Sequence, residues 1–148
     1  MRLHRMVTFA LGTAVMLGGE AFAHHSFEGE FDNSVAVTIT GVVSSVEMVN
    51  PHSWIYLDVP TDGAVERWAL EGPGPFNIQR RGVDLALIKP GAELGACGYL
   101  ARADVTTTKR EPGTGKAARK LQAAVLTTPA HGRFVWNNYH QGKCGLDR

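Results

Sequence analysis

Apolar and polar side chains alternate along the chain from residue 35 to residue 49. The apolar face carries Val35, Val37 and Ile39, and the polar face carries Thr38 and Thr40. This period of two predicts a long β-strand. Gly41 lies within the run, where we expect a bulge or a sharp bend. A long first strand that bends at a glycine suits a small barrel.

The same pattern, read with the turn signals, predicts four more strands and one short helix. Asn50-Pro51 turns the chain, and the TDGA sequence at 61–64 separates two alternating stretches that should form a hairpin. Gly72-Pro73-Gly74-Pro75 ends the second stretch, and a short helix is expected at 76–81. The further strands are predicted at 52–59, 65–71, 92–102 and 121–128. This order predicts an all-β fold, a five-stranded Greek-key barrel of the OB type, with a simple β-sandwich as the alternative.

The first 23 residues have the three parts of a cleavable signal peptide. Arg2 and Arg5 give a positive start, and residues 7–17 form an apolar stretch shorter than the roughly 20 residues that span a bilayer. Ala21-Phe22-Ala23 supplies the small residues that a signal peptidase reads. We therefore expect cleavage after Ala23, and a mature protein that is periplasmic or secreted, with no membrane insertion after cleavage.

The expected organisation follows from these two observations. A signal peptide at 1–23 precedes an extended lead-in at 24–34 and an OB-like barrel domain at 35–128. Residues 103–118 are polar and rich in glycine and threonine, which predicts a mobile loop within that domain. An irregular tail is expected at 129–148.

Charge and cysteine content narrow the class of protein. The chain has 15 Lys and Arg against 14 Asp and Glu. Because Arg2, Arg5 and Glu20 belong to the signal peptide, the mature chain has a formal net charge of zero, which gives no argument for a nucleic-acid partner. In an oxidising compartment its two cysteines, Cys97 and Cys144, are interpreted as one disulfide that ties the tail to the domain.

Cleavage after Ala23 would make His24 the new N-terminus. That residue would then offer an α-amine and an imidazole to one metal ion, and the amine, with a pKa of about 7.7–8.0, releases its proton readily to a metal at neutral pH. His25 adds a second imidazole, and His52 adds a third if the lead-in folds back along the second strand. Amine and imidazole nitrogens without thiolate favour Cu(II) or Ni(II), so copper is the cofactor we consider.

A plainer interpretation of these histidines stays open. His24 and His25 are adjacent, and neighbouring side chains of an extended segment point to opposite faces, so they do not automatically converge. His52 follows Asn50-Pro51, where proline restricts the backbone, and it could serve only to form that corner.

Four other residues are candidates for ligand binding. Asn50 lies at the corner, Trp54 and Trp68 lie on neighbouring predicted strands, and Glu71 precedes the Gly-Pro break. Aromatic residues on a barrel face can stack on ligands, although more often such rings fill a core. Glu71 could direct a carboxylate towards a site or simply end a strand at the solvent edge. We find no nucleophile motif with a recognisable base, so no catalytic residue is assigned.

Taken in order, these motifs resemble an exported bacterial family of unknown function, domain of unknown function 6152. The resemblance rests on His24-His25-Ser26-Phe27, Phe31-Asp32, Gly41-Val42-Val43, Asn50-Pro51-His52, Trp68-Ala69-Leu70-Glu71, Arg81-Gly82 and Lys89-Pro90-Gly91. It covers most of residues 24–128 and implies a secreted small β-barrel, with no activity to carry over. The loop after Arg102 and the tail depart from the family pattern, so the resemblance does not support the Cys97–Cys144 pair.

Three classes of function are compatible with the sequence. The first is a non-enzymatic binding or accessory module that holds copper through His24, His25 and His52. The second is an interaction module that uses the face around Trp54 and Trp68 to bind a small molecule or an envelope protein. The third is a copper-dependent redox enzyme built on the N-terminal histidine, for which no acid–base partner is evident.

Overall fold

The computed structural model describes residues 27–104, 106–137 and 142–145. Within these residues the chain forms seven β-strands, two short α-helices and one 3-10 helix. In chain order the elements are α1 (Phe27–Glu30), β1 (Phe31–Glu47), β2 (His52–Thr61), β3 (Ala64–Pro73), α2 (Pro75–Arg80), η1 (Leu85–Ile88), β4 (Glu93–Ala101), β5 (Thr108–Arg110), β6 (Ala117–Thr128) and β7 (Gly132–Val135).

The long strand β1 has two partners. Its first part pairs with β4 and its last part with β2, and Val42 pairs with a residue of each. The register with β2 shifts between Val43 and Ser45, so the irregularity lies just beyond Gly41, where it was expected. Gly41 instead permits a close approach between strands, because a Cβ there would lie 2.4 Å from the carbonyl oxygen of Asp58.

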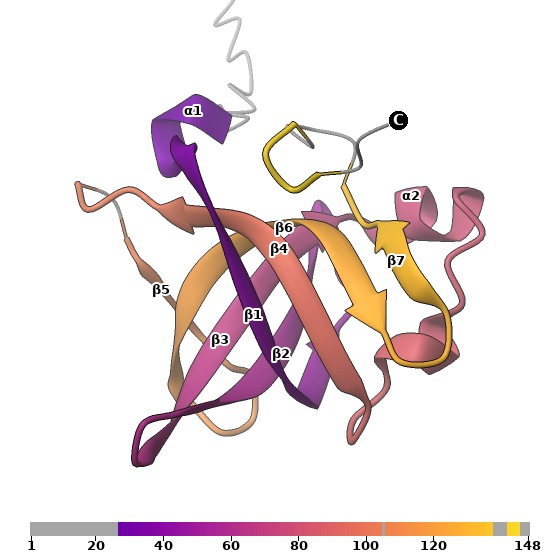
Figure 1. The fold of residues 1–148 in the computed structure, drawn as a ribbon, viewed down its shortest axis with the longest axis horizontal. Helices are drawn as coiled ribbons and strands as arrows, with labels where there is room; N and C mark the ends of the chain where they lie inside the picture. Colours follow the sequence, from indigo (N-terminus) through magenta and orange to yellow (C-terminus); the bar gives the residue numbers. More distant parts are fainter. Residues whose placement is uncertain (1–26, 105, 138–141, 146–148) are drawn as a thin grey trace, which may run out of the picture.

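Five strands pair in a closed ring. β1, β2 and β3 are antiparallel neighbours, β3 pairs with β6 in parallel, and antiparallel pairings of β6 with β4 and of β4 with β1 complete the circuit (Figure 1). The all-β prediction is confirmed. The strand count differs, because β5 and β7 also pair with β6. They lie in the predicted loop 103–118 and the predicted tail 129–148, and they are too short to show an alternating pattern.

The core lies inside this ring. Alternate residues of β2 and β3 point inward, and so do apolar residues of β4 and β6. The fully buried members include Ile55, Leu57, Leu70, Leu94, Leu121 and Leu126. The expected short helix forms as α2, and Ile78 and Ile88 from α2 and η1 pack against the same cluster. The fold is therefore held mainly by apolar burial that the alternation predicts.

The tail beyond β7 is part of the packed structure. Cys97 and Cys144 form the predicted disulfide, and Cys144 packs with Phe31 and Tyr99 in a second apolar cluster. Trp136 is fully buried in the main core, where its indole lies on Gly72 of β3. The tail is less irregular than expected, since it supplies a strand and one of the largest core side chains.

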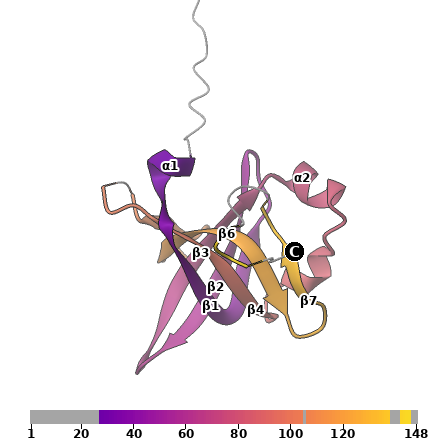
Figure 2. The ribbon, with the colours of Figure 1, turned by 45° about the horizontal axis from the view of Figure 1, so that its top comes forward.

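The two α-helices lie at the same end of the ring. Figure 2 shows α1 and α2 on opposite sides of that end, with the strands below them. Among the described residues, no helix is long and apolar enough to cross a membrane.

Candidate functional site

His52 and Glu71 form a pair at the end of the ring where the two α-helices lie. β2 begins at His52, directly after the cis peptide bond between Asn50 and Pro51. The imidazole Nδ1 of His52 contacts the carboxylate Oε1 of Glu71. The His52 side chain is 46% exposed, whereas that of Glu71 is 4% exposed. A buried carboxylate is thus paired with a half-exposed imidazole.

The hairpin explains why these two residues meet. Asp62-Gly63 forms its turn, with Gly63 at a φ of 83°, and the pair nearest to the turn is Thr61 with Ala64. Continuing that register places Trp54 opposite Glu71, and His52 two residues further along the same face. The turn at the TDGA sequence therefore sets the register that places His52 beside Glu71.

His52 and Glu71 both line a cavity of about 360 Å³. Its lining includes three carboxamide side chains, Asn77, Gln122 and Asn137, which come from α2, β6 and the segment after β7. Phe27 and Glu30 of α1 also line it. The cavity therefore joins the two strands of the pair to both α-helices and to β6, and its lining is rich in hydrogen-bonding groups.

The electrostatics of the pair follow from its geometry. The hydrogen bond to Glu71 raises the pKa of His52 above its ordinary value of 6.5, and the charge of Glu71 acts in the same direction, while partial burial opposes both. On the same face, the ammonium of Lys120 pairs with the carboxylate of Glu30. Burial lowers the pKa of Lys120. Each of these two carboxylates therefore has a nitrogen partner, His52 for Glu71 and Lys120 for Glu30.

The two tryptophans do not share a surface. Trp54 lies opposite Glu71 on the outer side, and the ammonium of Lys109 is 5.1 Å from its ring centroid. Trp68 lies opposite Leu57, which places it on the inner side, and it is 4% exposed in the main core. The expectation of one binding face formed by both rings is therefore wrong, because the rings point to opposite sides of the hairpin.

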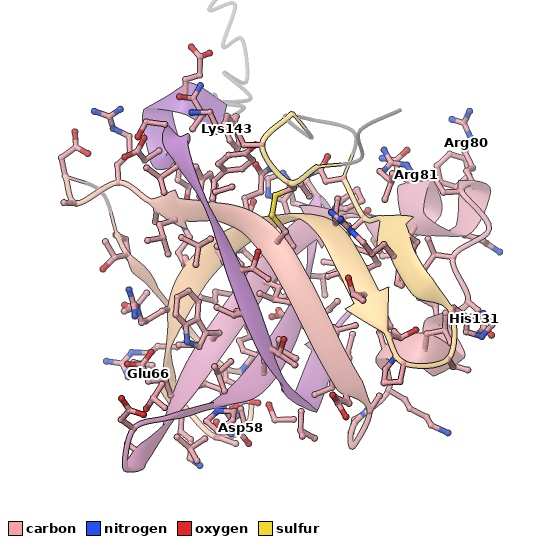
Figure 3. All side chains as sticks on the ribbon, viewed as in Figure 1. Asp58, Glu66, Arg80, Arg81, His131 and Lys143 are labelled. Atoms are coloured by element: carbon pink, nitrogen blue, oxygen red, sulfur yellow. A yellow bond between two sulfur atoms is a disulfide. The ribbon has the colours of Figure 1, made fainter. Side chains whose placement is uncertain are left out.

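The remaining candidate residues are distributed around this site. Asn50 is exposed, and its side chain lies close to the backbone of Gly74, just before α2. A Cβ added at Gly74 would be only 2.8 Å from Oδ1 of Asn50. His24 and His25 lie outside the described residues. His131 lies beside β7, on the same side of the molecule as Arg81 (Figure 3). Within residues 27–104, 106–137 and 142–145, no group of three or more His, Cys, Asp or Glu side chains could hold a metal ion.

A second buried polar cluster was not expected from the sequence. Glu111 is 2% exposed, and its carboxylate accepts hydrogen bonds from Ser45 at 2.5 Å and from Thr114 at 2.7 Å. Arg67 donates to it at 2.5 Å and to Asp58 at 2.8 Å. The cluster fixes the segment after β5 against β1 and β3. No local signal in a polar, glycine-rich stretch marks Glu111 as buried, because its partners come from distant strands.

Comparison with known proteins identifies a family whose function is unknown. No curated protein matches the chain. A family model described as a family of unknown function (DUF6152) matches residues 13–110, which is more than half of the 148 residues. The match spans the β2–β3 hairpin with His52 and Glu71, and it ends one residue before Glu111. The chain therefore belongs to this family of unknown function, DUF6152.

Proposed function

We propose that this protein is an exported, non-enzymatic binding module that holds a copper ion with the mature N-terminus of His24, the imidazole of His25 and the imidazole of His52. The module itself is an OB-like Greek-key barrel formed by the ring of β1, β2, β3, β6 and β4. The parallel pairing of β3 with β6 supports this assignment, since that contact closes the ring.

One observation carries the proposal: Phe27 and His52 line the same cavity. His24 precedes Phe27 by three residues, and three residues of extended chain span about 10 Å. The mature N-terminus therefore has the reach to bring its amine and imidazole to His52. The lead-in does not need to cross the molecule for the three candidate ligands to meet.

The donor chemistry also fits copper. The Nδ1 atom of His52 faces Glu71, so Nε2 is the nitrogen directed towards a ligand. A terminal amine and imidazole nitrogens, with both cysteines held in a disulfide, form a set suited to Cu(II). A bound Cu(II) would supply a Lewis acid that can exchange ligands at one end of the barrel.

A titration tests this proposal. The mature protein is isolated from the periplasm of a bacterial host, its N-terminus at His24 is verified by mass spectrometry, and CuSO₄ is titrated by calorimetry and electron paramagnetic resonance. Three variants run beside it: one with three additional alanines before His24, so that neither His24 nor His25 becomes the third residue, His52→Ala, and His131→Ala as the matched histidine control.

The proposal predicts one tight copper ion per chain. The three additional alanines should weaken binding by at least about tenfold, because they turn the His24 amine into an amide and separate the N-terminal amine from the His24 imidazole. His52→Ala should weaken binding to a similar extent, because it removes an imidazole ligand, whereas His131→Ala should bind like the wild type. Equal affinity in all four proteins, or a mature N-terminus at another residue, would overturn it.

A further inference from the structure

We infer that Glu71 is a positioning residue for this site: it accepts the Nδ1–H of His52 and thereby makes Nε2 the metal-binding nitrogen. The inference rests on the proposed copper function, but its first consequence is a property of the metal-free protein. Glu71 acts through His52 and does not itself touch the ion.

The first argument is the rigidity of Glu71. It lies near the end of β3, and its backbone is paired on one side with Trp54 of β2 and on the other with Gln122 of β6. A residue that is paired on both sides has little freedom to shift. Its side chain is 4% exposed, so the carboxylate is held in a fixed place among packed neighbours.

The second argument is the geometry of the imidazole. The two nitrogens lie on opposite sides of the ring, so with Nδ1 on Glu71, Nε2 points away from that buried carboxylate. In neutral histidine one nitrogen carries the proton and the other has the lone pair that binds a metal. An acceptor fixed at Nδ1 keeps the proton there and leaves the lone pair on Nε2.

The third argument is energetic. A buried ion pair contributes little to stability in comparison with apolar residues of similar volume, because desolvation offsets the attraction. His52 is also half exposed, which weakens the pair further. A carboxylate buried beside a cavity-lining histidine is therefore better explained by orientation of the ring than by stability. Carboxylates that hold metal-binding histidines typically change metal affinity by about 10–100-fold.

Two substitutions separate positioning from direct metal binding. Glu71→Gln keeps an oxygen that can accept from Nδ1–H, whereas Glu71→Leu keeps approximate volume and has no acceptor. Glu28→Gln is the matched control, because it makes the same chemical change at an exposed carboxylate of α1 that does not line the cavity. Thermal unfolding of each variant checks the fold.

The first readout is the tautomer of His52 in metal-free protein, measured by long-range ¹H–¹⁵N NMR at a pH above the pKa of this histidine. Wild type, Glu71→Gln and Glu28→Gln should show protonated Nδ1 and unprotonated Nε2. Glu71→Leu should move the proton towards Nε2. If His52 of the wild type already carries its proton on Nε2, the inference is wrong, whether or not any variant folds.

The second readout is affinity for CuSO₄. Glu71→Leu should lose about 10–100-fold, and Glu71→Gln should stay within a few-fold of the wild type. Equal loss in both variants with an unchanged tautomer would show that Glu71 is itself a ligand, which contradicts positioning. Absence of copper binding in the wild type would overturn the proposed function, but the tautomer of the metal-free protein would still test whether Glu71 orients His52.

Discussion

Replacing Glu111 by glutamine should lower the free energy of unfolding by about 3 kcal/mol, although Glu111 lies in a segment that resembles a surface loop in the sequence. The substitution preserves shape and removes the charge. The new amide NH2 could donate to a hydroxyl such as that of Ser45, but the guanidinium of Arg67 would lose the negative charge that now compensates it.

The magnitude follows from the partners that remain. Removing one member of a buried ion pair typically costs about 3–5 kcal/mol, because the other charge stays buried without compensation. Here Arg67, whose side chain is 12% exposed, keeps its contact with Asp58. The Asp58 side chain is 41% exposed, so it compensates only in part, and the expected cost lies near the lower limit.

The assay is urea unfolding of the wild type, Glu111→Gln and Glu93→Gln, followed by circular dichroism with the disulfide intact. Glu93 is exposed at the start of β4, so this control makes the same chemical change and should alter stability by less than about 0.5 kcal/mol. The loss at Glu111 should lower Tm by roughly 10 °C in a domain of this size.

The pH dependence provides an independent check on Glu111. Burial alone would raise its pKa, but hydrogen bonds from Ser45 and Thr114 and the charge of Arg67 hold the pKa below its ordinary value of 4.5. As the pH falls, Glu111 therefore takes up its proton at a lower pH in the folded state than in the unfolded state. The stabilisation is fully present above that ordinary value and is lost as the pH falls through the lower, folded value.

The stability difference between wild type and Glu111→Gln should therefore narrow as the solution is acidified below about pH 4.5. A difference that stays constant down to the folded pKa would refute the electrostatic part of this reasoning. A difference below 1 kcal/mol at neutral pH would refute the claim that Arg67 depends on Glu111.

Three further predictions concern other parts of the fold. Gly72→Ala should lower the free energy of unfolding in urea by about 1–3 kcal/mol, since the new Cβ would lie 1.9 Å from Nε1 of Trp136. Gly142→Ala is the control and should leave stability unchanged, because the space around Gly142 is open. Replacing both Cys97 and Cys144 by serine should lower the free energy of unfolding by about 2–4 kcal/mol, because the disulfide links residues 47 positions apart. A Tm of the wild type that does not change when the disulfide is reduced would contradict this. Glu71→Gln should lower the pKa of His52 in an NMR titration, since Glu71 raises it; the pair stabilises the fold fully below about 6.5 and ceases to do so as the pH rises through the higher, folded pKa.

Much of the fold could be predicted from the chain because its signals are local. The alternation after residue 35 and the TDGA turn correspond to β1, β2 and β3, and the cysteine content indicates the disulfide. β5 and β7 could not be found in this way, since three or four residues show no period, and both strands exist only because β6 pairs with them. Trp136 was missed for a related reason: its partner, Gly72, is distant in sequence.

Two residues of the candidate site could be singled out from the sequence, but the way in which they meet could not. His52 and Glu71 were both identified by residue type, and Glu71 was also open to interpretation as a strand end at the solvent edge. Its burial depends on β6, which follows it by about fifty residues and covers it through the parallel pairing. A local pattern carries no information about that contact. The same limit applies to Trp68, whose inward position depends on the hairpin register.

The parallel contact between β3 and β6 links the fold to the proposed chemistry. It is the contact that closes the ring, and its last pair joins Glu71 to Gln122, both of which line the cavity. The hairpin turn sets which residue of β2 faces Glu71, and β6 holds Glu71 in place. A site at this junction has one fixed wall made of strands. On its other side α1 lines the site, and α1 directly follows the N-terminal segment that contains His24. In the proposed copper site the strands would supply Nε2 of His52 from this fixed wall, and the N-terminal segment would supply the other ligands.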